Sequence, residues 1–220
     1  GSTDLVVFGT PVYAGRVPNV LLPYLKEKIK AAGALAVPIV LFGNRDYDDA
    51  LIELKGILES DGFDTIAAGA FIGEHSFSRL IAGGRPDEQD ILSAHRLSEI
   101  AAGRAAEMDP SARKLTIKGE EGRLRPYYAP RDRYGTPINI LKVKPKTNGK
   151  CINCGACAAA CPMGSISSED FGLVSGLCIK CGACIKKCPV VAKYYDDEGY
   201  IYHKSELEDL YTRRKEPELW

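Results

Sequence analysis

CINCGACAAACP, residues 151–162, and CIKCGACIKKCP, residues 178–189, carry the same cysteine spacing, C-x2-C-x2-C-x3-C-P. The two copies begin at Cys151 and Cys178, and together they hold all eight cysteines of the chain. Gaps of two residues let a tight loop direct three sulfurs inward, and Gly155 and Gly182 permit the turn conformations that such a loop needs. The proline after each fourth cysteine redirects the chain without a backbone N–H. The spacing predicts that several thiolates of each copy converge on one small body.

Three chemistries use cysteines in such patterns: zinc sites, disulfides and iron–sulfur clusters. Paired C-x2-C units also form zinc ribbons, but zinc gives no reason for the third cysteine or for the repeated Cys-Pro. Disulfides are disfavoured because cysteines this close in sequence are poorly placed to bridge each other. The chain also shows no resemblance to a secretory signal. Thiolates in a C-x2-C-x2-C-x3-C-P run are typical of iron–sulfur clusters, so we favour that interpretation.

Each copy resembles the cysteine run of bacterial ferredoxins. The resemblance implies two [4Fe–4S] clusters, because in that run the first three thiolates hold one cluster and the fourth ligates the other. On this assignment the first cluster is held by Cys151, Cys154, Cys157 and Cys188, and the second by Cys178, Cys181, Cys184 and Cys161.

The composition is ordinary for a globular protein, with 45% hydrophobic and 26% charged residues among 220. No apolar run approaches the ~20 residues of a membrane span. Residues 108–150 carry 11 Lys/Arg and 4 Asp/Glu, although the whole chain has no net charge. Such a basic strip could bind nucleic acid. We favour a solvated linker that docks on an acidic face, since the strip contains prolines and few regular apolar positions.

Before this strip, apolar runs alternate with amphipathic segments. The runs predict buried parallel strands at Leu5–Gly9, Ala36–Phe42 and Phe63–Phe71. The amphipathic segments predict helices at 19–32, with Asn19 as the N-cap, at 49–60 and at 87–106. Strands that alternate with helices predict a parallel α/β sheet with right-handed crossovers.

Loops rich in polar and aromatic residues follow the first two strands, where open parallel sheets bind ligands. TPVYAGRVPN, residues 10–19, and LFGNRDYDDAL, residues 41–51, resemble the two flavin loops of flavodoxins. The resemblance implies that Thr10, Pro11, Tyr13, Ala14 and Gly15 line one side of a flavin, and Gly43, Asn44 and Tyr47 the other. The alternative is that both tyrosines are ordinary exposed loop residues.

One part of the flavodoxin pattern has no counterpart in this sequence. A flavodoxin begins with a strand and a loop that binds the FMN phosphate at a helix N-terminus. Here the first predicted strand corresponds to the third strand of that fold, so Leu5–Phe8 would form a sheet edge. We therefore expect FMN to bind weakly or not at all, and we expect the exposed edge to permit self-association.

These patterns predict a partial flavodoxin-like α/β domain at 1–107 and a basic linker at 108–145. An α+β ferredoxin domain with two [4Fe–4S] clusters follows at 146–192. The tail at 193–220 is predicted to pack on the domains.

Together with FGTPVYAGRVPN, the segments GEHSFS, AGGRPDEQD and KEPELW resemble the EFR-type ferrodoxin family of anaerobic bacteria and archaea. The resemblance implies electron transfer between FMN and iron–sulfur clusters, a protein redox partner and a cytoplasmic location.

No catalytic triad stands out, so we expect an electron carrier rather than an enzyme, with no nucleic-acid partner. The alternatives are a flavin/iron–sulfur oxidoreductase that acts on a small molecule, which His75 in a pocket above Tyr13 and Tyr47 would favour, and a flavin-free regulatory module.

Overall fold

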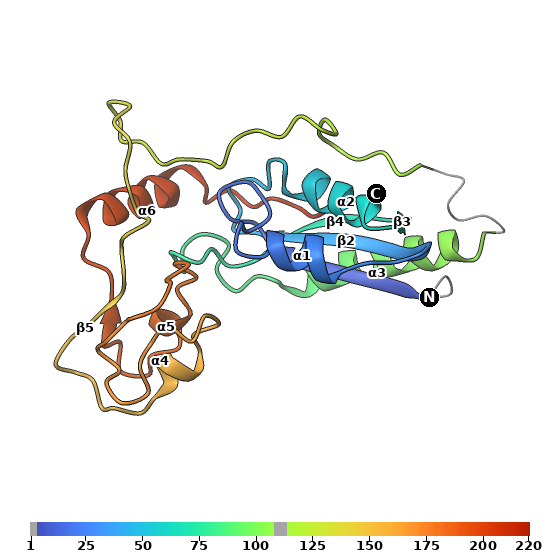
Figure 1. Cartoon of the computed structure of the whole chain (residues 1–220). Coiled ribbons are helices and arrows are strands. Elements are labelled where there is room, and N and C mark those ends of the chain that lie inside the picture. Colours follow the sequence, from blue (N-terminus) through green and yellow to red (C-terminus); the bar gives the residue numbers. More distant parts are fainter. Residues whose placement is uncertain (1–3, 108–113) are drawn as a thin grey trace. The chain divides into compact units, whose positions relative to one another are not determined.

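The computed structural model describes residues 4–107 and 114–220 (Figure 1). The start of the predicted first domain and the first part of the predicted linker lie outside these residues. The chain forms two compact units. The first consists of Gly1–His75, Ile81–Tyr128 and Tyr211–Trp220, and the second of Ser76–Leu80 and Ala129–Leu210.

The first unit contains a mixed sheet that is mostly parallel. Its strands are β1 (Leu5–Pro11), β2 (Ala34–Phe42), β3 (Phe63–Thr65), β4 (Gly69–Ile72) and β7 (Glu218–Leu219). The order is β1-β2-β4-β7, and β3 also pairs with β2. β1, β3 and β4 run parallel to β2, whereas β7 runs antiparallel to β4. The predicted parallel sheet is therefore present.

The third predicted strand is interrupted between β3 and β4. Ala68, in the interruption, exchanges two backbone hydrogen bonds with Trp220, of 3.1 and 3.0 Å. At Ala68 the backbone thus pairs with Trp220 instead of β2, and the C-terminal residues join the sheet beside β4. The sequence did not predict β7, because its partner β4 lies in a distant part of the chain.

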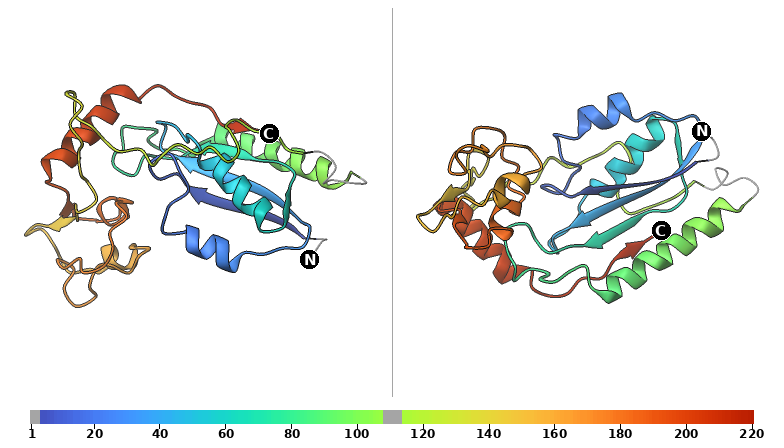
Figure 2. Two further views of the ribbon diagram at one scale, coloured as in Figure 1. Left: turned by 45° about the horizontal axis from the view of Figure 1, so that its top comes forward. Right: turned by 90° about the horizontal axis from the view of Figure 1, so that it is seen from below.

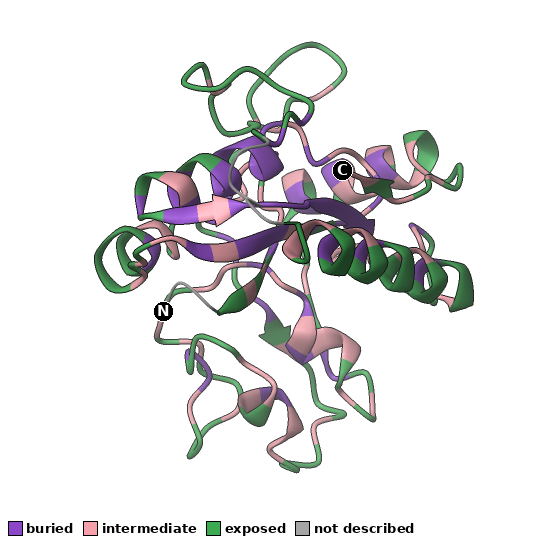
Figure 3. Ribbon diagram, turned by 90° about the vertical axis from the view of Figure 1, so that its right-hand side faces the viewer, coloured by how far each residue is buried: buried purple, intermediate pink, exposed green. Residues whose placement is uncertain are grey.

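Helices cover both faces of this sheet (Figure 2). They are α1 (Leu22–Lys28), α2 (Ala50–Ser60) and α3 (Glu88–Ala105). Ala36 and Val40 of β2 join the core on the side of α1 and α2, while Val37 packs with Leu97 of α3. Figure 3 shows this pattern, with buried residues on the strands and exposed residues along α3.

The first helix is shorter than predicted, and Asn19 is not its N-cap. α1 begins after Leu21, which makes no side-chain capping bond, and Pro23 lies in its first turn. Proline is tolerated there because the first-turn N–H groups have no helical partner, whereas further into a helix it would remove a hydrogen bond. The helix also ends early, since Ile29 is already extended.

β1 is an edge strand, as expected, but it is not fully buried. Within the part of the chain that the structure describes, its sheet partner is β2. Leu5 is 44% and Val7 63% exposed, whereas Thr10 is 2% exposed. The apolar run therefore marks a strand with one face open, because no described helix covers that side of β1.

The second unit contains little regular structure. Its elements are β5 (Lys146–Thr147), α4 (Ala156–Ala159), α5 (Ala183–Lys186), β6 (Lys193–Tyr194) and α6 (Glu198–Leu210). β5 and β6 pair in antiparallel fashion. α6 lies within the tail that the sequence placed at 193–220. Among the described residues, no helix combines the length and apolarity that a bilayer crossing requires.

Candidate metal centre

The two cysteine copies adopt the same backbone conformation. Positive φ angles recur at equivalent positions of the two copies, at Asn153 and Lys180, at Gly155 and Gly182, and at Gly164 and Val191. Gly155 (φ +76°) and Gly182 (φ +70°) occupy the left-handed region directly before α4 and α5. Glycine adopts this conformation without the Cβ penalty of other residues.

The symmetry extends to the flanking strand pairs. Thr147 of β5 pairs with Lys193 of β6, and an isolated bridge joins Ile166 and Val174. When Cys151 is aligned with Cys178, Thr147 falls on Val174, and Ile166 falls on Lys193. The second unit is thus built from two related halves. Each half contributes one tight cysteine loop and one residue to each of the two antiparallel pairs.

The α4 and α5 helices carry the third cysteine of each copy into the core. Cys157 and Cys184 are each 8% exposed, and they pack with buried Ile166 in one apolar cluster. This placement follows from the Gly-Ala-Cys sequence, in which the glycine turns the chain and the cysteine lies in the first turn of the helix. All eight cysteines are free thiols, so none of them forms a disulfide.

Two cavities bring the cysteines together in groups of four. The first cavity is lined by Cys151, Cys154, Cys157 and Cys188. The second cavity is lined by Cys161, Cys178, Cys181 and Cys184. Each cavity therefore receives the first three cysteines of one copy and the fourth cysteine of the other. The remaining lining is largely apolar and includes Phe171 in the first cavity and Tyr195 in the second.

Backbone N–H groups point at the fourth sulfur of each copy. The Ala192 N–H donates to Cys188 Sγ at 3.1 Å, and the Ser165 N–H, at the equivalent position of the first copy, donates to Cys161 Sγ at 3.4 Å. Burial acts to raise the pKa of the Cys188 thiol, but hydrogen bonds from the backbone of Ala192, Lys193 and neighbouring residues outweigh it and lower the pKa. These donors stabilise a thiolate, which is the form that ligates a metal.

Cys184 has the opposite electrostatic environment. Burial, with the neighbouring Cys181 and Cys178, raises the pKa of the Cys184 thiol to about 11. A buried thiolate of this kind needs a nearby cation, and a metal ligand is deprotonated when the metal binds. The donor set fits an iron–sulfur cluster: cysteine sulfurs around a small, largely apolar cavity, with N–H groups directed at sulfur.

The predicted flavin residues of the first loop lie at the carboxyl end of β1. Thr10 is buried, Tyr13 is half-buried, Pro11 and Ala14 are exposed, and Gly15 is buried. The carbonyl of Ala14 accepts a hydrogen bond from the Tyr128 N–H at 2.8 Å, and Tyr13 and Arg16 are bridged through their backbones. A Cβ on Gly15 would overlap the Asp48 carboxylate. The loop is therefore ordered by contacts within the first unit.

The second loop differs from the prediction, because its key side chains are turned inward. Tyr47 is 1% exposed, packs against Phe42 and Trp220, and donates its hydroxyl hydrogen bond to Glu218 Oε2 at 2.8 Å. The burial of Tyr47 contradicts the alternative of an exposed loop residue, and its contact with a flavin stays a prediction.

Asn44 and Gly43 are likewise engaged by the chain itself. Asn44 is 1% exposed, and its side-chain amide donates to the carbonyls of Tyr211 and Arg213 at 2.6 and 2.9 Å. A Cβ on Gly43 would overlap the His75 ring. The C-terminal segment therefore occupies the polar groups that the flavin was expected to use.

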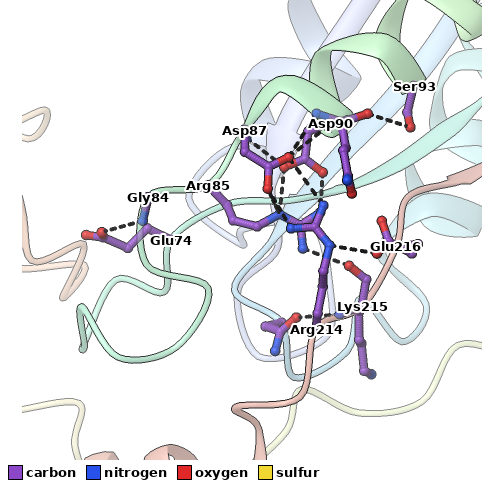
Figure 4. Close-up of polar contacts among 11 residues, drawn as sticks. Glu74, Gly84, Arg85, Asp87, Asp90, Ser93, Arg214, Lys215 and Glu216 are labelled. Carbon is purple, nitrogen blue, oxygen red and sulfur yellow. Dashed lines mark hydrogen bonds and ion pairs between the residues drawn. The ribbon is translucent and has the colours of Figure 1, made fainter.

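A network of charged groups holds this C-terminal segment on the start of α3 (Figure 4). Asp87 caps α3 in a capping box with Asp90, and Asp90 accepts a 2.6 Å hydrogen bond from buried Arg85. Arg85 also donates to the Lys215 carbonyl at 2.7 Å, and Arg214 donates to Asp87 at 2.5 Å. The sequence predicted a helix that begins at residue 87, but it gave no signal for the contacts with residues 214 and 215.

The cysteine geometry defines the class of protein: the second unit contains a ferredoxin-type 4Fe–4S domain, and the chain has an iron–sulfur electron-transfer role. In agreement, the family model described as a 4Fe-4S dicluster domain matches residues 150–192. A search of curated proteins found no significant match. The chain thus combines a 4Fe–4S domain with a separate α/β unit that has a parallel sheet.

Proposed function

We propose that this protein carries single electrons through two [4Fe–4S] clusters, which exchange them with a protein redox partner. The observation that supports this most is the sharing of cysteines between the two cavities. Cys188 joins the first three cysteines of the other copy, and Cys161 does the same in return. A zinc site or an unrelated pair of metal sites gives no reason for this exchange, whereas the bacterial ferredoxin pattern requires it.

In this proposal the eight cysteines are the ligands, four for each cluster. The clusters supply one-electron chemistry when they are bound. The chain keeps the sulfurs converged through the two glycine turns, surrounds them with largely apolar residues, and directs backbone N–H groups at Cys188 and Cys161. Such hydrogen bonds and burial are the means by which a protein adjusts cluster potentials.

Alkylation of the cysteines tests the sharing directly. In anaerobically purified Cys188→Ser protein, we expect iodoacetamide to label Cys151, Cys154 and Cys157, because their cluster loses its fourth ligand. Peptide mass spectrometry locates the label. Cys161→Ser is the matched control and should expose the other trio. The sharing is refuted if Cys188→Ser instead exposes Cys178, Cys181 and Cys184.

Metal analysis tests the cofactor itself. Two cubane clusters predict about eight irons and eight sulfides per chain. Iron near zero with about two zincs would overturn the proposal.

The first unit remains part of the proposal as a flavodoxin-like domain, within an EFR-type protein in which FMN couples to the clusters where that domain is complete. For this chain we expect FMN to bind weakly or not at all, since Asn44 and Tyr47 are already hydrogen-bonded to C-terminal residues. Titration of FMN fluorescence measures the affinity. Tight binding would contradict this part of the proposal.

We also propose that the open edge of β1 permits self-association. Sedimentation velocity of the wild type and of Val7→Lys tests it, because a charge on an exposed edge strand opposes pairing. A monomer at all concentrations of the wild type would exclude self-association.

A further inference from the structure

A lysine lines the first cavity at the position where the second cavity has an isoleucine. Lys193 in β6 is 2% exposed and lines the first cavity. Its counterpart in the other half, Ile166, is 7% exposed and lines the second cavity. Because the backbone pairing at the two positions is equivalent, the halves differ here by one charge.

The Lys193 ammonium has a neutral partner among the described residues. Its Nζ donates to the backbone carbonyl of Phe171, which also lines the first cavity. The described residues place no carboxylate within ion-pair distance of it. An isolated buried cation is costly unless an opposite charge lies nearby. The thiolate-bound cluster of the proposed function supplies that negative charge.

We infer that Lys193 makes the first cluster, held by Cys151, Cys154, Cys157 and Cys188, the centre with the higher reduction potential. Reduction adds one negative charge to a cluster, and a fixed cation at the cavity wall stabilises the reduced form more than the oxidised form. An electron shared between the two centres would then reside mainly on the first. This inference rests on the proposed function.

Another buried lysine, Lys180, lies beside the second group of cysteines, so the effect of its charge must be compared with that of Lys193. Its Nζ donates to the carbonyl of Leu141 and, at 3.0 Å, to the carbonyl of Cys178. It is not among the residues that line the second cavity, whose lining has no charged side chain apart from the cysteines. Its hydrogen bonds go to backbone oxygens, although its charge also acts on the Cys178 thiolate, whereas the Lys193 side chain lies at the wall of the first cavity itself.

The size of the effect follows from Coulomb's law. A unit charge about 10 Å from a redox centre, at an effective dielectric constant of ~20, changes an equilibrium more than tenfold. For Lys193→Met we expect the reduced-to-oxidised ratio of the first cluster, at a fixed ambient potential, to fall at least tenfold. This corresponds to a shift of about 59 mV to more negative potential. The second cluster should shift less.

The experiment is a redox titration followed by paramagnetically shifted NMR signals of the cysteine Hβ protons, which report each cluster separately. Lys193→Gln, which keeps a hydrogen-bond donor but no charge, should behave like Lys193→Met. Lys193→Arg should stay near the wild type. Lys150→Met removes an exposed lysine next to Cys151, and it should shift the potential much less because solvent screens that charge.

Iron and sulfide analysis of each variant separates the possible failures. A wild type without clusters would refute the proposed function. Loaded variants in which Lys193→Met and Lys150→Met shift the first cluster equally, or not at all, would refute only the inference. If the neutral Lys193 variants do not assemble clusters, Ile166→Lys decides: it should raise the potential of the second cluster, and no change would overturn the role of this position.

Discussion

Gly182→Ala should loosen the segment Ser76–Leu80, whereas the equivalent Gly155→Ala should not. Both glycines have left-handed φ angles, +70° and +76°, so alanine at either position carries a backbone penalty of about 1–2 kcal/mol. The surroundings differ. A Cβ on Gly182 would overlap the carbonyl oxygen of Ser76, while a Cβ on Gly155 would meet only the Phe171 ring, at 3.5 Å.

The difference between the two variants can be worked from the contacts of the segment. A backbone oxygen that overlaps a new Cβ cannot stay in place, so the segment must move. Two of its hydrogen bonds are then at risk, from Arg79 to the Lys186 carbonyl at 2.8 Å and from Ser78 to Glu208. At about 0.5–1.5 kcal/mol each, their loss adds about 1–3 kcal/mol to the cost of Gly182→Ala.

Native-state hydrogen exchange measures this difference, because it reports the free energy of local opening segment by segment. A loss of about 1.4 kcal/mol in local stability corresponds to about tenfold faster exchange. We therefore expect amides of Ser76–Leu80 to exchange about tenfold faster or more in Gly182→Ala, and at the wild-type rate in Gly155→Ala. Equal exchange in the two variants would refute the reasoning.

Two further predictions concern ion pairs of the first unit, whose unfolding in urea can be followed by the fluorescence of Trp220, the one tryptophan of the chain. The hydrogen bond from Arg125 lowers the pKa of Asp49 below 3.8, so its stabilisation is full above about pH 4 and is lost as the pH falls through the lowered value. Asp49→Asn should therefore cost about 1 kcal/mol at pH 7 and progressively less in acid; a cost that does not change with pH would contradict this. Arg85→Met leaves Asp90, 1% exposed, as a buried charge and should cost about 3 kcal/mol or more, and Arg214→Met, at an exposed pair, should cost far less; equal losses would contradict the role of burial.

The first three cysteines of each group follow from the sequence because local spacing determines them. Two-residue gaps and a glycine in the left-handed region bring Cys151, Cys154 and Cys157 together without help from the rest of the chain. The apolar run Ala36–Phe42 likewise predicted a buried parallel strand, which is present as β2. In these cases the deciding contacts lie close together in the sequence.

The flavin loops show where such reasoning stops. Tyr47 follows a strand, as a ligand-binding residue would, but its environment is decided by Glu218 and Trp220, at the far end of the chain. Periodicity carries no information about such contacts. The signal at Lys193 was present in the sequence, since aligning the two copies places it opposite Ile166, but its burial became evident only from the structure.

The position of β7 in the chain has a consequence for biosynthesis. β4 ends at Ile72, but its antiparallel partner begins at Glu218, after all eight cysteines. At about 5–20 residues per second, the ribosome needs roughly 7–30 s to deliver this partner. During that interval β4 remains a second unpaired edge of the nascent sheet, and both cysteine loops are synthesised before its partner. We therefore expect cofactor loading to begin before the sheet of the first unit is complete.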